Sequence, residues 1–97
     1  MALNRKLSPI LRGRPIVKYE ARPGQLSITF ADGSCLVVRL AGEAPPFSGT
    51  GTVEKVLEAG DRFSLVLESG SRLELTLAEP GASVSLRDGR GQVEYLG

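Results

Sequence analysis

The strongest structural signal in the sequence is LSITFADGSCLVVRLA, residues 26–41. Apolar and polar residues alternate on both sides of Ala31–Gly33, which is typical of two strands that each bury one face. A three-residue loop with Gly33 in the left-handed region sets Ile28 opposite Leu36 and keeps the apolar residues together, whereas a two-residue turn would mix the faces. The stretch therefore predicts a β-hairpin with a three-residue loop.

The same pattern returns 37 residues later as FSLVLESGSRLELTLA, residues 63–78. Six of the 16 aligned positions are identical, and four more exchange one apolar residue for another. A candidate strand precedes each hairpin, so we predict two copies of a three-stranded unit, at about residues 15–41 and 52–78. The alternative is that any two hairpins with the same loop would align this well.

A last hairpin is predicted at residues 83–96, where a four-residue loop at Asp88–Gly91 sets Leu86 opposite Val93. The breaker-rich segment Ala41–Gly51 links the two three-stranded units. Each unit exposes one apolar face, so we expect the two units to close on each other. The sequence thus predicts an all-β fold: a small barrel or compact sandwich of about eight short antiparallel strands.

The N-terminus is the only candidate helix. Residues 1–14 form a basic arm ahead of the all-β domain at residues 15–97, and we expect this arm to be partly disordered or to form one helical turn. The turn would cover Pro9–Arg12, with Ser8 as its N-cap and Gly13 as its end.

The composition excludes most enzyme classes. The chain has 97 residues, of which 41% are hydrophobic and 24% charged, as expected for one small soluble domain. It has no histidine and a single cysteine, Cys35, so Ser–His or Cys–His nucleophile pairs and the usual transition-metal sites cannot be built. We expect no enzymatic activity, no metal and no cofactor.

No stretch is apolar enough to span a membrane, and the first 20 residues lack the apolar core of a secretory signal. One cysteine cannot form an internal disulfide, which agrees with a reducing compartment. We therefore expect a cytoplasmic protein.

Positive charge is concentrated at the N-terminus. Residues 1–22 carry six basic side chains and one acidic one, a formal charge of +5, whereas residues 23–97 carry six basic and ten acidic ones, a formal charge of −4. The candidate binding residues are the six basic ones: Arg5, Lys6, Arg12, Arg14, Lys18 and Arg22.

Such a cluster is often only a solvated arm, but it could also bind an acidic protein, a membrane surface or the phosphates of a nucleic acid. Tyr19 is the only aromatic residue nearby on which a base could stack. The open edges of a duplicated sheet could in addition pair with another chain. The sequence favours a non-enzymatic interaction or assembly module with a protein partner or a second copy. The alternative is a small barrel that binds nucleic acid or a nucleotide.

Two families of small β domains invite comparison. Residues 12–32 resemble PilZ-type cyclic-dinucleotide barrels in carrying an arginine-bearing arm before the first strand, but Arg12 is followed by Arg14 rather than by an arginine four positions on, and residues 32–37 lack the closing glycine of the second motif. Sm-like barrels share the order of a helix followed by strands, but no nucleotide-binding motif can be placed. We therefore assign no family.

Overall fold

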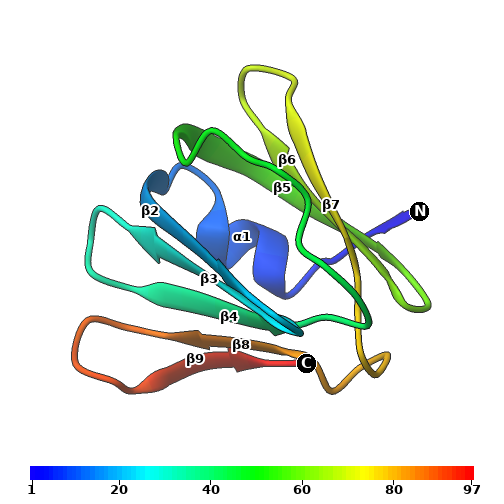
Figure 1. The fold of residues 1–97 in the computed structure, drawn as a ribbon. Coiled ribbons are helices and arrows are strands. Elements are labelled where there is room, and N and C mark those ends of the chain that lie inside the picture. Colours follow the sequence, from blue (N-terminus) through cyan, green and yellow to red (C-terminus); the bar gives the residue numbers. More distant parts are fainter.

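Alternating apolar and polar residues form strands over most of the chain. The computed structural model describes residues 1–97 as a nine-stranded antiparallel sheet with one short helix (Figure 1). The elements are β1 (Ala2–Leu3), α1 (Leu7–Leu11), β2 (Pro15–Arg22), β3 (Gln25–Phe30), β4 (Cys35–Arg39), β5 (Gly51–Ala59), β6 (Arg62–Leu67), β7 (Arg72–Thr76), β8 (Val84–Arg87) and β9 (Val93–Leu96).

The first long hairpin has the predicted register. Ile28 lies opposite Leu36, and the loop closes with the N–H of Phe30 donating to the carbonyl of Ser34 at 2.9 Å. Gly33 has a φ of 86°, a left-handed conformation that only glycine adopts without steric cost. The three-residue loop is therefore confirmed.

The meanders β2–β3–β4 and β5–β6–β7 share one pairing pattern. An offset of 37 residues maps every pair of β2 and β3 onto a pair of β5 and β6, and every pair of β3 and β4 onto a pair of β6 and β7. Even the bulge between Ile16 and Lys18 has its counterpart between Val53 and Lys55. Both leading strands, which do not alternate cleanly in sequence, are bulged at the same place.

The meanders meet at two places: Pro15 and Ile16 of β2 lie opposite Thr52 and Gly51 of β5, and Leu40 forms an isolated bridge with Leu77. The pairs Pro15–Thr52 and Leu40–Leu77 each join residues 37 positions apart, so an approximate twofold axis passes through both pairs. The sheet nevertheless stays open, with the order β7-β6-β5-β2-β3-β4-β8-β9, so of the two predicted alternatives, barrel or sandwich, the closed barrel is wrong. Beyond the single bridge, the edge of β4 pairs with β8 rather than with β7.

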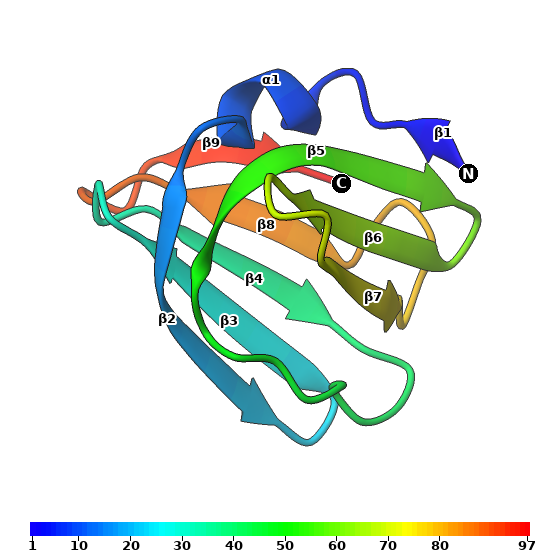
Figure 2. The ribbon, with the colours of Figure 1, turned by 90° about the horizontal axis from the view of Figure 1, so that it is seen from above.

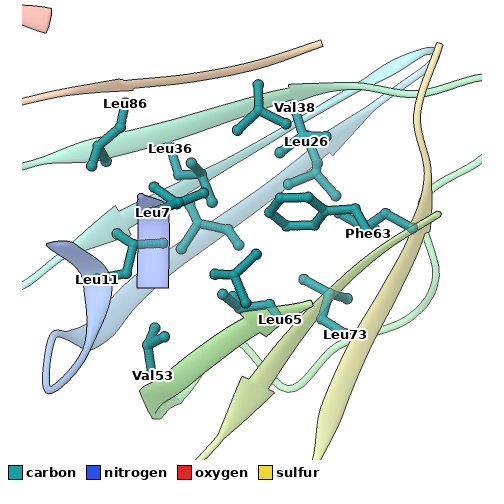
Figure 3. Packing of buried hydrophobic residues seen from close by; sticks show 14 of the residues in the cluster. Leu7, Leu11, Leu26, Leu36, Val38, Val53, Phe63, Leu65, Leu73 and Leu86 are labelled. Atoms are coloured by element: carbon teal, nitrogen blue, oxygen red, sulfur yellow. The ribbon is translucent and has the colours of Figure 1, made fainter. Parts of the chain in front are cut away.

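The apolar residues of the inner face form a core of 19 buried side chains. Figure 3 shows Leu36 of the first meander and Leu65 of the second pointing toward the same interior, together with Leu7 and Leu11 of α1. Both helical leucines are fully buried. As Figure 2 shows, α1 lies over one side of the sheet, next to β5. No helix is long and apolar enough to cross a membrane.

The helix itself differs from the prediction. It covers Leu7–Leu11 rather than Pro9–Arg12, and its first turn is capped by Asn4, whose Oδ1 accepts the N–H of Leu7 at 2.8 Å. Gly13 follows the helix with a φ of 83°, as expected for a residue that ends one. The predicted N-cap, Ser8, therefore lies inside the helix.

Ser8 completes the edge of β5 instead. Its hydroxyl donates to the carbonyl of Val56 at 3.0 Å and accepts the N–H of Val56 at 2.9 Å. The same carbonyl accepts the N–H of Asn4 at 2.8 Å. Because unpaired backbone groups are costly when buried, this hydroxyl takes the place of a neighbouring strand.

The register predicted for the last hairpin is wrong. Leu86 lies opposite Tyr95, not Val93, because a bulge adds Glu94 to β9. The Asp88 carboxylate organises the loop by accepting two of its backbone N–H groups at 2.8 and 2.9 Å. The N–H of Asp88 also donates to the carbonyl of Gln92 at 2.8 Å, so the loop holds three residues, Gly89–Gly91, rather than the predicted four.

Ser8→Ala should lower the free energy of unfolding by about 1–3 kcal/mol, because it leaves the buried Val56 N–H without a partner. Urea unfolding followed by far-UV circular dichroism measures the change. An unchanged midpoint would contradict the role given to this hydroxyl.

Ser64→Ala should have the opposite sign. Ser64 lies on the outer face of β6 between Leu57 and Glu74, and its buried hydroxyl has no hydrogen-bond partner. Replacing an unpaired buried hydroxyl by a methyl group should raise the free energy of unfolding by up to about 1 kcal/mol. A loss of stability equal to that of Ser8→Ala in the same urea titration would refute this.

Candidate binding surface around the N-terminal segment

Arg14, one of the six predicted binding residues, is used inside the fold. Its guanidinium donates to both carboxylate oxygens of Glu94 at 2.9 and 3.0 Å and to the hydroxyl of Ser34 at 2.9 Å. The Asp32 carboxylate lies 3.4 Å from the same group. The side chain is only 19% exposed, so Arg14 fastens the first hairpin loop to β9 and is not free for a ligand.

These contacts shift two pKa values. The hydrogen bond to Glu94, aided by the charges of Glu94 and Asp32, raises the pKa of Arg14 against the opposing effect of burial. The hydroxyl of Ser34, its backbone N–H and the charge of Arg14 lower the pKa of Asp32. Both shifts favour the charged forms of Arg14 and Asp32 at neutral pH, in a cluster whose charges are paired within the fold.

Lys18 and Arg22 lie on the outer face of β2 with Glu20 between them. The Lys18 ammonium is 2.6 Å from the Glu20 carboxylate and the Arg22 guanidinium is 4.0 Å from it. The ion pair raises the pKa of Lys18 and lowers that of Glu20. These two cations therefore share a carboxylate and lie apart from the N-terminal segment.

The three remaining cations, Arg5, Lys6 and Arg12, have no acidic side chain within 4 Å. Arg5 precedes α1 and Arg12 follows it, and both line a hollow of about 760 Å³. Lys6 lies nearby on the exposed side and does not line the hollow. The structure thus brings together only part of the predicted cluster.

We call this hollow the α1–β5 groove. Its lining residues are Leu3, Arg5, Ser8, Pro9, Arg12, Glu54 and Lys55. Lys55, which the sequence did not point to, adds a third cation, and its ammonium is 3.9 Å from the Glu54 carboxylate. The groove therefore carries three positive charges and one negative charge. Neither the spacing nor the composition of the sequence around Lys55 indicates that this residue lines the same groove as Arg12.

The walls of the groove are fixed by the fold. The N–H of Gly13 donates to the carbonyl of Val53 at 2.8 Å, and Ser8 and Asn4 hold the middle of β5 as described above. The two buried leucines of α1 anchor the opposite side of the helix in the core. Arg5 and Arg12 are therefore presented at the two ends of a docked helix rather than on a loose arm.

The strand edges are poorly suited to pairing with a further strand. The linker between β4 and β5 runs beside β2 in Figures 1 and 2, where the Tyr19 hydroxyl donates to the carbonyl of Pro45 at 2.8 Å and the Tyr19 ring lies 5.2 Å from that of Phe47. β9 is short and bulged, and β7 carries Arg72 and Glu74. Short, bulged or charged edges disfavour pairing with a further chain.

Comparisons with family models, with curated proteins and with solved structures find no match for this chain. The surface itself therefore has to carry any functional conclusion.

Asp32→Asn should reduce the loss of stability that the protein undergoes as the pH falls. A carboxylate with a lowered pKa stabilises the fold fully at neutral pH, and this stabilisation is lost as the pH falls below about 4 toward the lowered value. Thermal unfolding between about pH 2 and pH 6 should show a shallower acid loss in the variant than in the wild type. Parallel profiles would contradict the lowered pKa of Asp32.

Proposed function

We propose that the protein is a non-enzymatic binding module that holds an acidic segment of a protein partner in the α1–β5 groove. The observation that carries the proposal is the convergence of Arg5, Arg12 and Lys55 on the largest hollow of the surface. Arg5 and Arg12 have no ion-pair partner, so a carboxylate from another chain would not have to displace one. Complementary charges raise association rates and select acidic partners over basic ones.

The groove suits a protein segment better than a nucleic acid. No aromatic side chain lines it, and proteins that hold single strands rely on aromatic platforms for the bases. Arg14, Lys18 and Arg22 would be needed for a continuous basic stripe, but each of them already contacts a carboxylate. A membrane surface is also a poorer match, because it is flat and these cations surround a concavity.

We further interpret the two meanders as copies of one three-stranded unit, and this explains why the groove occurs once. The counterpart of Lys55 is Lys18, 37 positions earlier, which is paired with Glu20. The counterpart of the β5 edge is the edge of β2, which lies beside the linker instead of a helix. Only the second copy has a helix with a cation at each end.

The double variant Arg5→Glu/Arg12→Glu should weaken binding of a fluorescein-labelled Asp/Glu peptide at least about tenfold, because two attractive charges become repulsive. Fluorescence anisotropy at low salt measures this. Lys18→Glu/Arg22→Glu changes the net charge by the same amount outside the groove and is the matched control, with little expected effect.

Two other ligands complete the test. Single-stranded RNA and vesicles that contain phosphatidylserine should bind more weakly than the acidic peptide at equal salt. Tighter binding of either one, or equal losses in the two double variants, would overturn the proposal in favour of the alternative ligand or of a nonspecific charge effect.

A further inference from the structure

At one end the α1–β5 groove continues into two apolar side chains, of which one is exposed and one is half-buried. Leu3 lines the groove and is 49% exposed, and it lies directly opposite Leu57 across the β1–β5 pair. Side chains that face each other across two antiparallel strands lie on the same face of the sheet, so these leucines form one surface. We call Leu3 and Leu57 the apolar rim.

The rim and the cations follow one another along β5. Arg12 lies next to Gly13, which is bonded to Val53, whereas Leu3 pairs with Leu57, four residues further along the strand. Four residues of a strand span about 13 Å, which matches about four residues of an extended ligand. Lys55 lies between these ends, on the same face of β5 as Leu57.

We infer that the segment bound in the groove carries an apolar side chain next to its acidic residues, with its carboxylates toward Arg12 and Lys55 and its apolar side chain on the apolar rim. This inference rests on the proposed function and adds the chemistry of the ligand. Single exposed apolar residues are normal on protein surfaces. Here, in contrast, two leucines adjoin each other at the end of a cationic hollow.

The apolar rim and the cations of the groove should contribute to affinity with different dependence on salt. Removing apolar area from water contributes to affinity independently of salt, whereas the cationic part of the groove is screened by it. A plain polyanion would use only the cations. A segment with both features would gain affinity and keep more of it as salt increases.

The test compares two labelled peptides of equal charge, which share the same short run of Asp and Glu. In one peptide this run is flanked on both sides by Leu, and in the other it is flanked on both sides by Ser. Flanking both sides makes the direction of the bound peptide irrelevant. We expect the Leu-flanked peptide to bind wild-type protein roughly fivefold to tenfold more tightly in fluorescence anisotropy.

Leu3→Ser should remove this advantage by weakening only the Leu-flanked peptide, while Leu3→Met should retain it. Leu96→Ser is the matched control, because Leu96 is 68% exposed on β9, away from the groove, and should change neither affinity. Unchanged circular dichroism and an unchanged urea midpoint for Leu3→Ser establish that the variant is folded.

Equal binding of the two peptides to wild-type protein, or equal weakening of both by Leu3→Ser, would overturn the apolar rim and leave the acidic groove intact. Failure of both peptides to bind wild-type protein would overturn the rim and the proposed function together.

Discussion

The middle of β5 has a backbone edge that no full strand covers, and the position of the N-terminal segment follows from this constraint. The N–H and carbonyl of Val56 need partners, and the Ser8 hydroxyl and the Asn4 N–H supply them. Docking at this point buries the leucines of α1 and brings Arg5 and Arg12 to the two sides of one groove. The candidate site is thus a by-product of satisfying one strand edge.

The sequence predicts the local part of this fold well. The alternation in residues 26–41 and the glycine at position 33 fix the register of the first long hairpin, because a wrong register would turn apolar side chains to solvent. The last hairpin has a weaker pattern. Its loop is bonded to the Asp88 carboxylate, and its bulged residue, Glu94, binds Arg14 from the far end of the chain, so neither feature follows from a local pattern.

Less of the candidate site was predictable. The excess of positive charge before position 23 is visible in the sequence. Which of these basic residues form ion pairs within the fold is not visible, because that depends on which carboxylates the fold brings near them. Arg14 meets Glu94, 80 residues away, and Arg12 shares a groove with Lys55. Neither of these arrangements produces a periodic pattern or a characteristic spacing in the sequence. Barrel closure failed for a similar reason, since the late hairpin occupies the edge of β4.

The bond between Ser8 and Val56 joins residues 48 positions apart, and this separation affects both the order of folding and local unfolding. Hairpins close short loops and form early, whereas a contact of this range has a larger closure entropy to overcome. Docking of the helix should therefore be a late folding step and its release an early local opening. Any occupant that requires the docked helix adds its own binding free energy to that closed state, so occupancy and local order are thermodynamically linked.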